Sequence, residues 1–177
     1  MVDRASVHEA HRRATTEVLL GDRGHTVGMT RPSSPQLVSI GYEGRSAAEL
    51  IEVLRAQRVA VLVDIRLTPI SRKPGLSKTA LAAAVRAAGI EYVHLRELGN
   101  PKANRPGYRA GESAAFDLYR SVLSSDGGQS ALRHVTELLD GGAVALLCFE
   151  RDHADCHRHQ VADELGARCQ DLQVTHA

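Results

Sequence analysis

The chain has 177 residues, of which 43% are apolar and only 3% aromatic, and its net charge at pH 7 is +1. This length suits one domain of ordinary size, with a core built from Leu, Val, Ile and Ala. No apolar run reaches the roughly 18 residues that a membrane span requires, and the near-neutral charge gives no overall attraction to nucleic acid.

The N-terminus has no continuous apolar stretch of the kind found in secretion signals. We therefore expect a cytoplasmic protein that does not contact membranes. Three cysteines, Cys148, Cys156 and Cys169, leave one over from any pairing, so reduced thiols are expected in that compartment.

The first 36 residues are expected to form a partly flexible N-terminal extension. Residues 7–20 could form a helix, but residues 21–36 are rich in Gly, Pro and Ser, which is typical of loops. The sequence thus predicts an extension over 1–36 and one α/β domain over 37–177.

Short apolar runs and amphipathic segments alternate through that domain. Ser46 and Glu49 have the spacing of a capping box, which starts a helix, and Ser77 is expected to cap another that stops at Gly89. Strands are predicted at 37–41, 59–65, 90–95, 143–149 and, as an edge strand, within 171–177. Further helices are predicted at 113–125, 130–142 and 158–167.

This alternation predicts a single three-layer α/β domain with a mainly parallel sheet of four to five strands and flanking helices, a Rossmann-like arrangement. The runs at 59–65 and 143–149 contain almost no polar residues, as expected for strands buried on both faces. In open sheets of this kind, ligands bind beyond the carboxyl ends of the strands.

Polar side chains follow the ends of four predicted strands, and we expect them to meet at one edge of the sheet. The candidates are Tyr42 and Glu43, Asp64 and Arg66, Tyr92 and His94, and Cys148 and Glu150. For any one of these residues, the alternative is a cap or an ion pair at the rim of the sheet.

Two loops that follow strands are basic and contain no acidic residue. Residues 66–78 include Arg66, Arg72, Lys73 and Lys78, and residues 100–111 include Lys102, Arg105 and Arg109. This charge favours an anionic ligand, such as a phosphorylated metabolite, a nucleotide or a nucleic-acid backbone. The candidate binding residues are Tyr42, Arg66, Ser71, Lys78, Tyr92 and Arg158. The alternative is a solvated basic surface.

The segment from Leu146 to Leu165 has three interpretations. Cys148 could be a nucleophile at the end of a strand, with His157 or His94 accepting its proton and Arg158 favouring the thiolate. Cys148, Cys156 and His157, with His153 or Glu150, could instead bind zinc or iron, although the seven residues between the cysteines exceed the spacing of a zinc knuckle. In the third interpretation, both cysteines only pack.

Four segments resemble the DUF488 family, a bacterial and archaeal family named for having no assigned function. They read "SIGYEGRS", "VLVDIRLTPISRKPGLSK", "GIEYVHLRELGNP" and "LLCFERDHADCHRHQVADEL", and the resemblance extends from about Leu37 to Gly166. The resemblance implies that the following residues are motif positions: Gly41, Tyr42, Glu43, Asp64, Arg66, Pro69, Ser71, Ser77, Lys78, Tyr92, His94, Leu98, Gly99, Cys148, Glu150, Cys156, His157 and Arg158. Asn100 stands where many members have a second glycine.

A weaker similarity to rhodanese-like domains lies in "VLVDIR" and in a cysteine that ends a strand before a loop and a helix. The loop after Cys148 is longer than a rhodanese active-site loop, so this likeness is a chemical analogy.

The leading hypothesis is an enzyme that binds an anionic substrate, such as a nucleotide, a nucleic-acid base or a phosphorylated metabolite. Cys148 would act as its reactive thiol, His94 or His157 would move protons, and Glu43, Asp64 and Glu150 would orient these groups. The rivals are a non-catalytic module for nucleic acid or nucleotides and a Cys/His metalloprotein. The enzyme hypothesis requires no cofactor, whereas the metalloprotein hypothesis requires a transition metal. The sequence does not decide the oligomeric state, and a dimer is possible.

Overall fold

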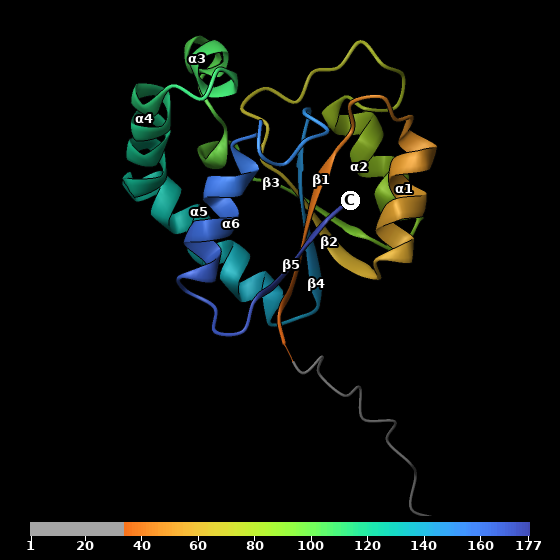
Figure 1. Ribbon diagram of the computed structural model, residues 1–177. Helices are drawn as coiled ribbons and strands as arrows, with labels where there is room; N and C mark the ends of the chain where they lie inside the picture. The colour runs from red at the N-terminus through yellow and green to blue at the C-terminus, as the bar shows by residue number, and fades with distance from the viewer. Residues whose placement is uncertain (1–33) are drawn as a thin grey trace, which may run out of the picture.

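The computed structural model describes residues 34–177, so most of the predicted extension lies outside the described residues. Five strands and six α-helices alternate along the described chain (Figure 1). The strands are β1 (Gln36–Gly41), β2 (Val59–Asp64), β3 (Glu91–His94), β4 (Ala143–Cys148) and β5 (Gln173–His176). The helices are α1 (Ala47–Ala56), α2 (Lys78–Ala87), α3 (Arg105–Arg109), α4 (Ser113–Ser124), α5 (Asp126–Leu139) and α6 (Arg158–Gly166), with short 3-10 turns at Arg96–Leu98 and Lys102–Asn104.

All five strands form one parallel sheet in the order β3-β2-β4-β1-β5. This confirms the predicted α/β, Rossmann-like domain, with β5 as the expected edge strand. β4 lies at the centre between β2 and β1, and all six of its residues are buried. The sequence pattern and the position in the sheet therefore agree, because a central parallel strand is covered on both faces.

Helices cover both faces of the sheet, which gives the three predicted layers. α1 and α2 pack on one face, and α3 to α6 lie on the other (Figure 1). Side chains alternate along β4, so that Val144 and Leu146 enter the core beneath α4–α6, whereas Ala145 and Leu147 enter the core beneath α1 and α2. This period of two decides which face each strand-end residue points to.

The local helix signals are mostly, but not entirely, as predicted. Ser46 and Glu49 form the expected capping box on α1. Ser77 precedes α2, but its hydroxyl makes no cap; it donates to the Ser71 carbonyl instead. Helix α5 begins at Asp126, four residues before the predicted start, because Ser125 caps the amide of Gly128. Since a Cβ on Gly128 would lie 2.4 Å from the Val122 carbonyl oxygen, the close approach of two helices requires this glycine.

Within residues 34–177, no helix is both long and apolar enough to cross a membrane.

Candidate functional site

Four metal-ligating side chains converge at the carboxyl end of β4. They are Cys148 at the end of that strand, Glu150 in the following loop, and Cys156 and His157 directly before α6. One ligand atom from each lies within 4.8 Å of all the others. This set, which we call the Cys/His/Glu cluster, joins three of the predicted catalytic residues with the second cysteine of the metal hypothesis.

The two thiols of this cluster share the same two neighbours. Glu150 Oε2 accepts from the thiol of Cys148 at 3.1 Å and from the thiol of Cys156 at 3.3 Å. The Nδ1 atom of His157 lies 3.8 Å from the first sulfur and 3.7 Å from the second. Burial raises the pKa of the Cys156 thiol well above its usual value, and the neighbouring Cys148 raises it further.

The orientation of His157 is fixed by its surroundings. Its Nε2 atom lies 3.4 Å from the carbonyl oxygen of Ile65, which can only accept a hydrogen bond, so Nε2 is the donor. The Tyr119 ring packs edge-on against the imidazole, with ring centroids 5.1 Å apart. These contacts leave the Nδ1 lone pair facing the two sulfurs.

Glu150 links the cluster to a cationic side chain. Its Oε1 atom accepts from the Arg109 guanidinium at 2.7 Å. Burial by itself would raise the pKa of Glu150, but hydrogen bonds from Arg109, from its own backbone amide and from the two thiols outweigh burial and lower the pKa to about 2. The carboxyl group is therefore ionised at neutral pH.

Arg158 holds the loop that carries Glu150. The side chain is fully buried, and its Nη2 atom donates to the carbonyl oxygen of Glu150 at 2.6 Å and to that of Asp152 at 3.2 Å. Only Nη2 is engaged by main-chain carbonyls; Nε and Nη1 are buried without a hydrogen-bond partner among the described residues, and the side chain does not line the neighbouring cavity. These contacts favour a positioning role, and anion binding by Arg158 stays a prediction.

Gly41 lets the end of β1 approach the same loop. A Cβ at this position would lie only 1.8 Å from the Glu150 carbonyl oxygen. The chain after Gly41 continues alongside the loop, where the Tyr42 amide donates to the Cys148 carbonyl at 3.2 Å and the Glu43 amide donates to the Phe149 carbonyl at 2.9 Å. The absence of a side chain at Gly41 is therefore a condition for the position of Glu150.

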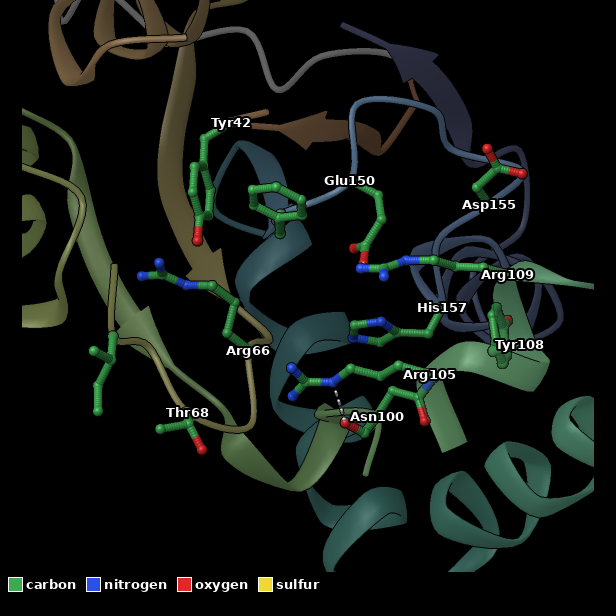
Figure 2. Close-up of a pocket in the computed structure, with 12 residues that line it drawn as sticks. Tyr42, Arg66, Thr68, Asn100, Arg105, Tyr108, Arg109, Glu150, Asp155 and His157 are labelled. Atoms are coloured by element: carbon green, nitrogen blue, oxygen red, sulfur yellow. Dashed lines mark hydrogen bonds and ion pairs between the residues drawn. The ribbon is translucent and has the colours of Figure 1, made fainter. Parts of the chain in front are cut away.

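A cavity of about 160 Å³ opens beside the cluster, at the carboxyl edge of the sheet. Figure 2 shows Glu150 and His157 in its wall. Three arginines and several aromatic and polar side chains complete the lining: Arg66, Arg105, Arg109, Tyr42, Tyr108, Phe149, Thr68, Ile70, Asn100 and Asp155. The cavity therefore combines positive charge with two members of the cluster.

The three arginines of the cavity differ in their partners. Arg66 is paired with Asp64, and Arg109 is paired with Glu150. Arg105 donates from Nε to the Asn100 carbonyl at 3.2 Å and has no carboxylate partner among residues 34–177 (Figure 2). Arg105 is thus the cavity arginine whose charge is least neutralised by the protein.

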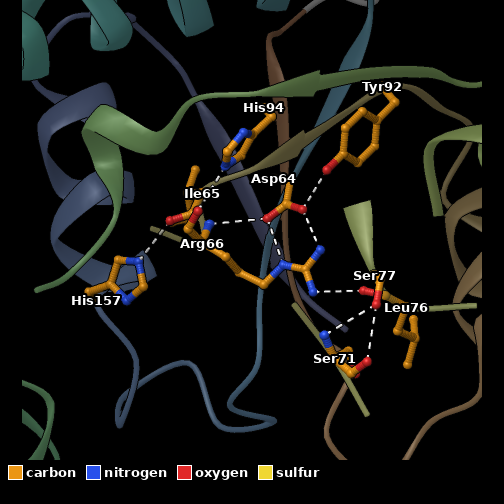
Figure 3. Close-up of polar contacts among 9 residues, drawn as sticks. All are labelled: Asp64, Ile65, Arg66, Ser71, Leu76, Ser77, Tyr92, His94 and His157. Carbon is orange, nitrogen blue, oxygen red and sulfur yellow. Dashed lines mark hydrogen bonds and ion pairs between the residues drawn. The ribbon is translucent and has the colours of Figure 1, made fainter. Parts of the chain in front are cut away.

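Asp64 forms a second polar network, separate from the cluster (Figure 3). Its carboxylate accepts from the Arg66 Nε atom at 2.8 Å, from the Arg66 Nη2 atom at 2.5 Å and from the Tyr92 hydroxyl at 2.6 Å. Arg66 also donates to the Leu76 carbonyl at 2.9 Å, and its guanidinium carbon lies 5.1 Å from the centroid of the Tyr42 ring. Asp64 is fully buried and Arg66 is 5% exposed, so this network is an internal ion pair.

The pKa values in this network shift as expected for a buried ion pair. Burial would lower the pKa of Arg66, but the hydrogen bonds and charge of Asp64 outweigh burial and raise it. Burial raises the pKa of Tyr92, and Asp64 raises it further. Both side chains therefore keep their protons, and neither offers a base.

The other predicted site residues lie outside the cluster. His94 Nε2 is 2.9 Å from the Arg66 carbonyl oxygen, and Glu43 Oε2 accepts from the Arg151 amide at 3.1 Å. Ser71 is bonded to Ser77 within the basic loop. Lys78 is exposed at the start of α2, and neither it nor Ser71 lines the cavity.

Sequence reasoning assigned no individual role to several residues of the cavity wall. Arg105, Arg109, Tyr108 and Asn100 all come from the segment 100–111, whose acid-free composition was the signal that marked it. The sequence did not indicate the short helix α3, which ends at Arg109, the residue that pairs with Glu150 after β4.

One comparison with known proteins gives a match. The family model DUF488, described as a domain of unknown function, matches residues 46–165. This segment contains β2, β3, β4 and the whole Cys/His/Glu cluster. Comparisons with curated proteins and with solved structures each found no significant match. Because the family model covers most of the chain, the protein belongs to the DUF488 family.

Proposed function

We propose that this DUF488 protein is an enzyme that binds a small anionic substrate in the arginine-lined cavity and acts on it with the Cys/His/Glu cluster. The observation that carries the proposal is that Glu150 and His157 belong both to the cluster and to the cavity wall. A substrate in the cavity would therefore contact the cluster directly. Reactive groups and substrate must lie within hydrogen-bond reach for catalysis.

Arg105 is the residue best suited to hold the anion. Its guanidinium carries five N–H donors, of which one is used by the Asn100 carbonyl. Arginine binds carboxylate and phosphate groups through two parallel hydrogen bonds. Arg109 could share its charge between Glu150 and the anion, whereas Arg66 has most of its donors occupied.

The size of the cavity favours a small ligand or the anionic end of a larger one. Its 160 Å³ is below the roughly 300 Å³ at which pockets for drug-sized ligands begin. The adjoining hollow of about 570 Å³ is lined by four carboxylates and two arginines: Glu43, Glu150, Asp152, Asp155, Arg109 and Arg151. Acidic side chains repel phosphate, so a nucleic-acid strand that left the cavity through this hollow would be repelled. A small anion held entirely within the arginine-lined cavity would avoid this repulsion.

A reactive cysteine is one way in which the cluster could act. His157 Nδ1 is oriented to accept a proton from Cys148, which ends β4 behind the two cluster residues that line the cavity, Glu150 and His157. Glu150 Oε2 accepts a hydrogen bond from the same thiol at 3.1 Å. Cys148 thus contacts both an imidazole and a carboxylate, which supports it as a participant.

The test is titration calorimetry of the full-length protein with inorganic phosphate and with sulfate. Arg105→Gln should weaken binding by at least tenfold, since a charge-assisted hydrogen bond contributes about 1.5–3 kcal/mol. Arg120→Gln is the matched control, because Arg120 is exposed and pairs with Asp117 on α4. Equal affinity of both variants, or no binding of either anion by the wild type, would refute the proposal.

A further inference from the structure

We infer that Cys148, Glu150, Cys156 and His157 bind one thiophilic divalent metal ion, Zn²⁺ foremost. The site itself stands on the geometry of the cluster. Only its use in catalysis rests on the function proposed above.

Four of the six distances between the ligand atoms are close to those of a tetrahedral site, and none of the six exceeds 4.8 Å. Zinc–ligand bonds of ~2.3 Å to sulfur and ~2.1 Å to nitrogen or oxygen place a sulfur about 3.6 Å from its nitrogen and oxygen neighbours. The corresponding distances here are 3.1, 3.3, 3.7 and 3.8 Å. Each differs from the tetrahedral value by no more than about 0.5 Å, so an ion could be enclosed with small side-chain adjustments.

The donor types select the class of ion. Two sulfurs and one imidazole nitrogen are soft or borderline ligands, which favour Zn²⁺ over Mg²⁺ or Ca²⁺. Cys₂His is also a known ligand set of catalytic zinc sites, in which the fourth position faces the substrate. Here the fourth donor is Glu150, which lines the cavity.

The surroundings of His157 match those of a metal ligand. A ligating imidazole usually donates its other N–H to a carbonyl or a carboxylate, which fixes the free nitrogen toward the metal. Nε2 of His157 meets the Ile65 carbonyl, and Nδ1 faces both sulfurs at nearly equal distances. A histidine at nearly equal distances from two sulfurs suits an ion shared by both sulfurs better than it suits a pair with a single nucleophile.

The charges near the cluster are also those of a metal site. Two thiolates and a carboxylate carry three negative charges, which a divalent ion and the guanidinium of Arg109 would balance. Arg158 holds the main chain of the same loop by its carbonyl oxygens. The loop from Glu150 to Cys156 is therefore held by the ion pair between Arg109 and the Glu150 side chain and by the hydrogen bonds from Arg158 to main-chain carbonyls.

A bound ion would lie in the wall of the cavity, because Glu150 and His157 are the two ligands that line it. Four protein ligands close a tetrahedral site, so the ion could act as a Lewis acid toward a substrate or a water only by adding a fifth ligand or by releasing Glu150. Within the protein, Arg105 would then hold the substrate and Arg109 would position Glu150.

The first experiment measures metal in the full-length protein, purified without an affinity tag from cells grown with zinc, iron and manganese. Elemental analysis should find about one zinc per chain. After metal removal, Co²⁺ should produce an intense thiolate-to-cobalt charge-transfer band, which histidines elsewhere in the chain cannot produce. Cys148→Ser and Cys156→Ser should each abolish or strongly reduce the band.

Cys169→Ser is the matched control, because Cys169 is also a buried free cysteine but its nearest polar contact is Thr136, at 3.9 Å. Should the cluster variants fail to fold, alkylation of the wild type gives an independent result. Saturating Zn²⁺ should protect two of the three thiols under conditions that keep the fold. Less than a tenth of an equivalent of metal, no charge-transfer band and no thiol protection would overturn the inference.

This result is separable from the test of the proposed function. Loss of metal binding with intact phosphate binding would remove the metal site alone. Stoichiometric metal with no anion binding would retain the metal site and remove the substrate proposal.

Discussion

Replacing Gly41 with alanine should displace the loop that carries Glu150. Gly41 ends β1, and the new methyl group would lie 1.8 Å from the Glu150 carbonyl oxygen, 2.5 Å from its carbonyl carbon and 2.9 Å from the Arg151 Cα atom. All three are backbone atoms, so no side-chain rotation can relieve the overlap. The loop must move away from β1.

The size of the displacement follows from the contact distance. An ordinary contact of 3.4 Å requires the gap to open by about 1.6 Å. Overpacking of this kind costs about 1–3 kcal/mol, and we expect the upper end because main-chain hydrogen bonds from Tyr42 and Glu43 to the loop also lengthen. A loop displacement of about 1.6 Å would carry Glu150 well beyond the roughly 0.5 Å adjustments that the metal site requires, so metal affinity should fall by at least tenfold.

Two measurements on the same protein preparation check this prediction. Urea denaturation gives the change in unfolding free energy, and competition with a zinc indicator gives the change in affinity. Gly166→Ala is the control, because nothing lies within 4 Å of a Cβ at that position in α6. It should be neutral or stabilise the protein by up to about 1 kcal/mol through helix propensity. A Gly41→Ala variant with wild-type stability and metal affinity would refute the link between the end of β1 and the cluster.

Four further substitutions test the two polar networks and the cap of α1. Asp64→Asn should cost about 3–5 kcal/mol of stability, because it leaves a buried guanidinium without its counter-charge. Tyr92→Phe should cost about 1 kcal/mol, because only one hydrogen bond is lost. Both variants should retain bound zinc, and loss of metal from folded protein would show that the two networks are coupled. Arg158→Met should lower both the melting temperature and the zinc content, since it frees the loop carbonyls, and normal zinc content would contradict its positioning role. Ser46→Ala should cost about 1 kcal/mol in urea denaturation through loss of the capping box, with phosphate and zinc binding unchanged; no loss of stability would mean that the cap contributes nothing.

The strand ends were predictable because buried parallel strands have a simple sequence pattern. The apolar runs at β2 and β4 marked both strands, and the polar residues after them marked the edge where the cluster and the cavity lie. Alternation of side chains, which is also a sequence property, explains why Asp64 and Cys148 belong to different networks. Asp64 faces the side of Leu62 and Tyr92, whereas Cys148 faces the side of Val144 and Leu146.

The rest of the site depends on loop paths that have no periodic signal. The turn between Glu150 and Cys156 brings the second thiol back to the first, and its course is fixed by Arg158 and by the close approach of Gly41. The sequence also did not indicate which arginines pair with carboxylates and which do not. The sequence predicted Arg66, Lys78 and Arg158 for the anion; of these, only Arg66 lines the cavity, where Arg105 also lies.

The central position of β4 also constrains how the protein is made. Strand β4 pairs with both β1 and β2, and these two strands do not pair with each other in the described sheet. During synthesis, a chain that has emerged only as far as α5 therefore holds two open strand edges and lacks Cys148 altogether. Non-local pairing of this kind slows folding and leaves edges exposed to aggregation. The strand that joins β2 to β1 also contributes the first thiol of the Cys/His/Glu cluster, so the sheet and the cluster should form at the same late stage of synthesis.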